Sequence, residues 1–134
     1  MSETKPKIIS RAIGRRKSAI ASIRLVSGTG EITVNGKPSA VYFPGLLAQS
    51  RYSLPFKTLT LTKYSASVKV HGGGPSGQLD AVVLGLARAL ASLKEDYKST
   101  LRTAGLLTRD SRERQRRMVG MGGKSRRKKQ SPKR

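Results

Sequence analysis

The chain has 134 residues, the usual size of one folded domain with extensions, and this length leaves no room for two independent cores. Its 28 Lys and Arg against 7 Asp and Glu give a formal net charge of +21, which would repel itself unless a polyanion such as nucleic acid supplied negative charge. Since there is no cysteine, one histidine and no apolar run of signal-peptide or membrane-span length, disulfides and thiolate or imidazole metal sites are excluded, and a soluble intracellular protein is expected.

The first third of the chain predicts strands of a small sheet. The segment SAIASIRLV at 18–26 mixes β-branched and small residues, as strands do. The next segment, GEITVNGKPSAVYF, alternates around Asn35 and Gly36, a dipeptide that favours a two-residue hairpin turn. We therefore predict one strand followed by a hairpin.

The middle of the chain predicts a short helix and then a further strand. The helix is expected within YFPGLLAQSRYSL at 42–54. The following stretch, FKTLTLTKYSASVKV at 56–70, is rich in β-branched residues. Strand alternation within it places Val68 and Val70 on one face.

Two helices are predicted after this strand. The segment GQLDAVVLGLARALASL at 77–93 has apolar residues at spacings of three and four, which form one stripe facing a sheet. These residues are Leu79, Val82, Val83, Leu86, Leu90 and Leu93. The segment EDYKSTLRTAGLL predicts a shorter helix that ends near Gly105. Strands followed by helices favour an α+β fold.

The loop GGGPSG at 72–77 satisfies the pattern G-x-G-x-x-G of dinucleotide-binding turns. In those proteins an acidic residue follows a second parallel strand, whereas Glu95 and Asp96 are expected at the end of the same helix. We therefore favour a tight strand-to-helix turn that glycine permits. Its exposed backbone N–H groups also suit an RNA phosphate.

No catalytic or metal site is predicted. His71 has no cysteine or second histidine beside it, so a structural or RNA-contacting role is favoured. Asp80 is separated from Glu95 and Asp96 by more than about 20 Å along a continuous helix, which is too far for a carboxylate pair. We predict that the chain is no enzyme and has no cofactor.

The positive charge is concentrated at both ends. Residues 1–17 carry 6 basic and 1 acidic residue, residues 18–108 carry 10 and 4, and residues 109–134, here named the tail, carry 12 and 2. Nucleic acid is the favoured partner. A nucleoid-type DNA-binding protein and a membrane-active polypeptide also fit the charge, but no DNA-reading helix, coiled-coil seam or apolar helical face accompanies the cations.

The motifs, taken in order, resemble one known family. They are GRRKSAIASIRL, GTGEITVNGKP, YF, VHGGGPSGQLDAVVLGLARAL, GLLTRDSR and a basic segment closing with SPKR, and they cover nearly all of the chain. The sequence resembles the ninth protein of the small ribosomal subunit in its bacterial or organellar form. Gln115 and Met118 stand where that family usually has ERKK, and Ser131-Pro132 stands where it has an aromatic residue and serine, so the stacking contact of that aromatic is not carried over.

The resemblance implies a compact sheet of four strands with helices on one face and a left-handed β-α-β crossover. It divides the chain into a basic extension (1–7), a globular RNA-binding domain (8–108) and the extended tail. It also implies a cytoplasmic protein within the ribosome, an organellar ribosome being an alternative. Its partners would be small-subunit head-domain RNA, neighbouring head proteins and the peptidyl-site tRNA, with no membrane.

Site residues follow from the matching positions. We assign tRNA binding to Lys133 and Arg134. We assign ribosomal RNA binding to Arg11, Arg15, Arg16, Lys17, His71, Gly72, Gly73, Gly74, Arg109, Arg112, Arg114, Arg116, Arg117, Lys124, Arg126, Arg127, Lys128 and Lys129.

The tail is not expected to order by itself. Fixing its backbone costs about 1 to 2 kcal/mol per residue, whereas burial of Met118, Val119 and Met121 returns under about 10 kcal/mol in total. Contacts between its cations and phosphates release counterions and offset the cost of ordering. We therefore expect the RNA partner to determine the conformation of the tail.

Overall fold

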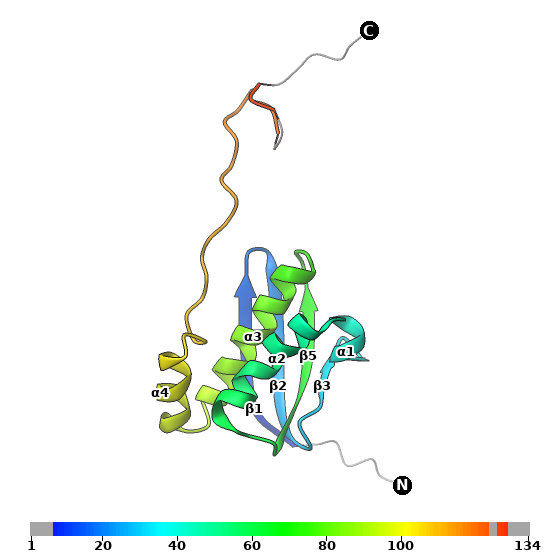
Figure 1. Ribbon diagram of the computed structural model, residues 1–134, viewed down its shortest axis with the longest axis vertical. Helices are drawn as coiled ribbons and strands as arrows, with labels where there is room; N and C mark the ends of the chain where they lie inside the picture. The colour runs from blue at the N-terminus through cyan, green and yellow to red at the C-terminus, as the bar shows by residue number, and fades with distance from the viewer. Residues whose placement is uncertain (1–6, 124–125, 129–134) are drawn as a thin grey trace.

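The computed structural model describes residues 7–123 and 126–128, and these contain one five-stranded sheet with helices packed on it (Figure 1). The strand order in the sheet is β1-β2-β5-β3-β4. The strands are β1 (Ile8–Arg16), β2 (Ala19–Ser27), β3 (Ile32–Val34), β4 (Lys37–Pro38) and β5 (Tyr64–His71). The mixed α+β class is confirmed, and the sheet has one strand more than the resemblance implied because the short β4 extends it at the edge.

The predicted hairpin joins β3 to β4. Asn35 and Gly36 have φ of 51° and 79°, the left-handed conformation that such a turn requires. The Asn35 side chain also donates to the Val70 carbonyl oxygen and accepts from the Val70 N–H, both at 2.9 Å. The turn is therefore tied to the end of β5.

Strand β1 is the element that the sequence analysis missed. It pairs antiparallel with β2, which in turn pairs antiparallel with β5. The expectation that Arg15 and Arg16 precede the first strand is wrong, because they end β1, and only Lys17 lies in the turn to β2. The polar residues of IISRAIGRR concealed a strand that is defined by its pairing with β2.

Four helices complete the described fold: α1 (Ser39–Tyr42), α2 (Leu46–Leu59), α3 (Pro75–Ala91) and α4 (Glu95–Thr103). The strand expected from residue 56 is corrected, because 56–59 belong to α2 and β5 begins only at Tyr64. Tyr52, Pro55 and Phe56 follow helical spacing and are all buried, so packing against the core overrides the β-branched composition.

Helix α3 supplies the main core contact of the sheet. Its predicted apolar stripe is confirmed, and Val82, Leu86 and Leu90 are completely buried. The facing residues of the sheet are those that alternate inward along β2, namely Ala19, Ala21, Ile23 and Leu25, each 0% exposed. Leu93 lies beyond the end of α3 and is partly buried against the same core.

Helix α4 corrects a detail of the sequence analysis. Glu95 and Asp96 form its first turn rather than the end of the preceding helix. Acidic residues there are favourable, since the N-terminal end of a helix carries partial positive charge. The predicted end of this helix near Gly105 is confirmed.

Strand β1 and helix α3 approach each other at two glycines. A Cβ atom added to Gly14 would lie 2.5 Å from the backbone nitrogen of Gly85 and would clash with the Ala81 carbonyl oxygen. A Cβ atom on Gly85 would lie 2.6 Å from the Cγ1 atom of Ile23. The absence of both side chains therefore sets the distance between the helix and the sheet.

Beyond α4, the described residues 106–123 and 126–128 form no helix or strand. The extended course of the tail and the hand of the crossover stay predictions, although β3 and β5 do run parallel, with α1 and α2 between them in the chain. Within the described part of the chain, no helix is both long and apolar enough to cross a bilayer.

Candidate nucleic-acid interface

Two basic segments that are far apart in the sequence lie at one end of the sheet. The turn between β1 and β2 contains Lys17 and Ser18, and Ile20 pairs in register with His71 at the end of β5. The loop after β5 is in close contact with that turn, because a Cβ atom on Gly72 would lie 2.5 Å from the Ser18 carbonyl oxygen. We name residues 15–18 and 71–74 the basic end (Figure 1).

The glycine loop presents its backbone at this end. Gly72 and Gly73 have φ of 77° and 64°, so the loop uses a conformation that other residues rarely adopt. Gln78 of α3 donates to the Gly72 carbonyl oxygen at 3.1 Å and holds the loop against the helix. Helix α3 begins at Pro75 directly after Gly74, and its first-turn N–H groups have no acceptor within the helix. This arrangement suits a phosphate oxygen.

The exposed side chains around the loop are cationic or neutral. Arg15, Lys17 and His71 are exposed. The parallel strand that a dinucleotide fold would place next is missing, because α3 is followed by α4 and no strand among the described residues comes after it. The glycine pattern therefore marks a strand-to-helix turn.

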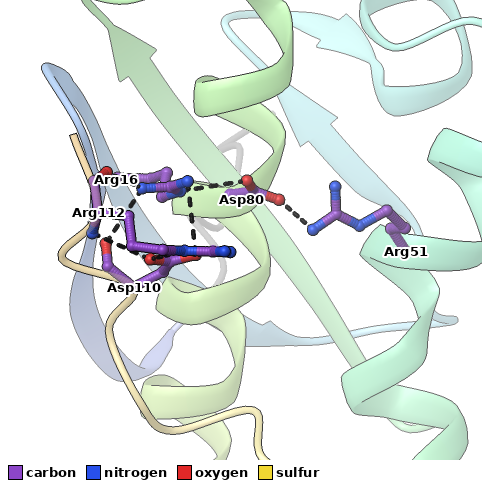
Figure 2. A network of polar contacts seen from close by, with 5 residues as sticks. All are labelled: Arg16, Arg51, Asp80, Asp110 and Arg112. Carbon is purple, nitrogen blue, oxygen red and sulfur yellow. Dashed lines mark hydrogen bonds and ion pairs between the residues drawn. The ribbon is translucent and has the colours of Figure 1, made fainter. Parts of the chain in front are cut away.

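Arg16 differs from its neighbours because its side chain is only 12% exposed. Its Nη1 atom donates to the backbone oxygens of Asp110, at 3.3 Å, and Arg112. Its guanidinium also lies 3.5 Å from the carboxylate of Asp80 on α3 and 3.4 Å from that of Asp110 (Figure 2). Arg16 thus holds the start of the tail against β1 and α3, and the RNA contact predicted for it stays a prediction.

Two carboxylates complete this network by bridging arginines. Asp80 also pairs with Arg51 of α2. Asp110 accepts from the Arg112 side chain, with 2.8 Å between Oδ2 and Nη2, and from the Arg112 backbone N–H at 3.0 Å. These hydrogen bonds hold the pKa of Asp110 well below its usual range and raise the pKa of Arg112. Asp110 therefore stays charged at physiological pH.

Sequence reasoning missed the roles of Asp80 and Arg51. Asp80 was considered only as a partner of another carboxylate, and Arg51 was assigned no role. The two residues are 29 positions apart, on different helices. No local pattern could have paired them, because the contact depends on how α2 packs against α3.

Comparison with known proteins was decisive for the family. Residues 14–134 match the sequence model of the family described as "Ribosomal protein S9/S16". The chain belongs to the ribosomal protein S9/S16 family.

Individual relatives agree with the family match. The chain is 44% identical over 121 residues to "Small ribosomal subunit protein uS9" of Gloeothece citriformis, covering 89% of this chain and 88% of the relative. It is 47% identical over 118 residues to the protein of the same name from Maridesulfovibrio salexigens, covering 87% and 91%. With the protein of that name from Synechocystis it shares 47% identity over 118 residues, covering 86% and 85%.

Membership of the S9/S16 family confirms two sequence predictions. The chain is a structural constituent of the small ribosomal subunit, and it is not an enzyme. The alternative of a nucleoid-type DNA-binding protein gains no support from these relatives. Among the residues that the structure describes, no group of three or more His, Asp or Glu side chains could hold a metal ion.

The remaining predicted RNA-binding residues of this S9/S16 chain lie apart from the basic end. Arg11 is exposed in the middle of β1. The described tail cations are exposed in segments without helix or strand: Arg109, Arg112, Arg114, Arg116, Arg117, Arg126, Arg127 and Lys128. Lys124, Lys129, Lys133 and Arg134 lie outside the described residues.

Proposed function

We propose that this chain anchors to the ribosomal RNA of the small-subunit head through a globular domain, residues 8–108, and extends its tail across the RNA toward the peptidyl-site tRNA. Residues 1–7 would add a short basic extension. The neighbouring partners would be other head proteins, as the family resemblance implies. The assignment to the S9/S16 family and the distribution of charge support this proposal.

One observation carries the proposal furthest. The basic end combines exposed cations with a glycine loop and the start of a 17-residue helix. A phosphate there would meet backbone N–H groups, the positive end of the helix dipole and nearby cationic side chains. The network around Arg16 places the start of the tail beside β1, whose C-terminal residues belong to this end.

We expect the affinity of the full chain for a head-domain RNA fragment to fall steeply with salt. If six phosphates are neutralised, the slope of log K against log salt is about −4 to −5, because each contact releases counterions. Filter binding at several salt concentrations measures the slope. A DNA duplex of equal length serves as the competitor that tests the nucleoid alternative. A slope near zero, or preference for the DNA, would contradict the proposal.

We further propose that Lys133 and Arg134 contact the backbone of the peptidyl-site tRNA. Small subunits reconstituted with a chain lacking these two residues should assemble normally and bind tRNA several-fold more weakly in the peptidyl site. The loss should be shared by many tRNA species, because phosphates rather than bases are contacted. Filter binding of several tRNAs is the measurement.

The matched control for this deletion removes two charges elsewhere. Lys57→Gln and Lys98→Gln change exposed cations on α2 and α4. Subunits with the control variant should bind tRNA as the unaltered subunits do. Unchanged tRNA affinity after the deletion, with assembly verified, would show that the tail serves RNA anchoring alone.

A further inference from the structure

One face of the sheet is left open by the described helices. Along β2, Ile23 and Leu25 are completely buried against α3, whereas Ser22 and Arg24 between them are exposed. Along β5, Val68 is buried and Ser67 and Lys69 beside it are exposed. Because successive residues of a strand point to opposite faces, the exposed side chains share the face turned away from the helices.

We name this surface the open face and define it by its exposed central residues: Arg11, Ser22, Arg24, Ser67 and Lys69. Of its three cations, only Arg11 was among the RNA-binding residues expected from the sequence. Arg24 and Lys69 stand alone in the sequence between apolar or small residues, so no charge run marked them.

The strand register brings the cations together. Arg11 and Arg24 are direct partners across β1 and β2. Lys69 pairs with Ser22, and Arg24 pairs with Ser67, so Arg24 and Lys69 are diagonal neighbours. Like charges opposite each other destabilise a sheet, and the arrangement is therefore unfavourable unless an anion lies over the face.

The strands carry no charge that could neutralise this cluster. None of the residues in β1 to β5 is acidic. The acidic residues that the structure describes lie in loops, helices or the start of the tail: Glu31, Asp80, Glu95, Asp96, Asp110 and Glu113. The open face is thus cationic, while acidic side chains occur on the helical layer.

The open face also lacks an aromatic side chain. Its central positions between the cations are serines, and Tyr64 of β5 packs against the core instead. Recognition of single-stranded RNA on a sheet depends on aromatic residues that stack with bases, whereas double-stranded RNA is recognised by its shape, phosphates and 2′-hydroxyls. A flat cationic surface without aromatics favours the backbone of an RNA helix.

We propose that the open face is a second RNA-binding surface, on which Arg11, Arg24 and Lys69 contact the phosphates of an RNA helix. The inference rests on the proposed RNA-anchoring function and adds to it a site separate from the basic end and the tail. Arg24 and Lys69 gain a role in binding, and the unfavourable pair of Arg11 and Arg24 is explained by the anionic partner.

The test compares two triple variants with equal loss of charge. Arg11→Gln, Arg24→Gln and Lys69→Gln change the open face. Lys57→Gln, Lys98→Gln and Arg102→Gln change exposed cations of α2 and α4 and serve as the control. Binding of the full chains to a head-domain RNA fragment, to a 20-base-pair RNA duplex and to a single strand of equal length is measured over a range of salt.

We expect the open-face variant to lose about ten- to hundredfold in affinity for the fragment and the duplex at moderate salt, and its salt slope to become shallower by about 2 to 3. The control variant should stay within about threefold of the unaltered chain. Equal losses in both variants would overturn the inference, because net charge alone would then explain binding. Preference of the unaltered chain for the single strand over the duplex would also overturn it.

Two further measurements separate loss of the site from loss of the fold and from an apolar site. Arg11→Gln alone relieves a like-charge pair, so it should weaken duplex binding while leaving the midpoint of thermal unfolding unchanged or higher. Ile13→Ser changes the exposed isoleucine of β1, which is 54% exposed, and should leave RNA affinity within about twofold. A loss confined to Ile13→Ser would indicate an apolar docking surface and overturn the inference. If the unaltered chain binds no RNA at all, the proposed function itself fails.

Discussion

Replacing Gly14 with valine is expected to lower the free energy of unfolding by about 3 kcal/mol or more. The new side chain would begin 2.5 Å from the Gly85 nitrogen and would clash with the Ala81 carbonyl oxygen. Both obstacles are backbone atoms of α3, so no side-chain rotation can relieve the overlap, and the helix must move away from the sheet. Thermal unfolding followed by circular dichroism should show a midpoint lower by roughly 10 °C or more.

The control for this prediction is Gly74→Ala. Gly74 has φ of −103°, and an added Cβ would meet nothing within 4 Å, so the change should alter the free energy of unfolding by less than about 1 kcal/mol. An unchanged midpoint in the Gly14 variant would show that α3 does not pack on β1 as described.

Truncation after Thr108 is expected to give the largest loss of RNA affinity. It removes 12 basic and 2 acidic residues, a net charge of +10, and with them a large share of the phosphate contacts. If half of the net charge meets phosphate, the salt slope becomes shallower by about 4, and affinity at moderate salt falls by roughly a hundredfold or more. Filter binding to the head-domain RNA fragment measures both quantities.

A second truncation makes the effect graded. Ending the chain after Gly123 removes 7 basic residues and no acidic ones, and keeps the contacts of Arg16 with Asp110 and Arg112. This chain should have an intermediate slope. Both truncated chains should remain folded, since the removed ion pairs of Asp110 are largely solvent-exposed. Equal slopes for all three chains would contradict a phosphate-binding role of the tail.

The sequence alone determined the features that depend on local pattern. The apolar spacing of residues 77–93 specifies α3, because side chains three and four positions apart share one face of a helix. Asn35 and Gly36 specify the hairpin turn, because their positive φ is required there. The positive charge and the ordered motifs pointed to an RNA partner and to the ribosomal family without any tertiary information.

Only the tertiary structure decided the features that depend on residues far apart in the chain. Strand β1 is defined by pairing with β2, and residues 56–59 are helical because Phe56 fills the core. The role of Arg16 as an anchor for the start of the tail requires Asp110, which is 94 positions away. The open face likewise requires three strands in register before Arg24 and Lys69 become neighbours. Local pattern cannot encode these contacts, because they form only when packing of the apolar faces brings the elements together.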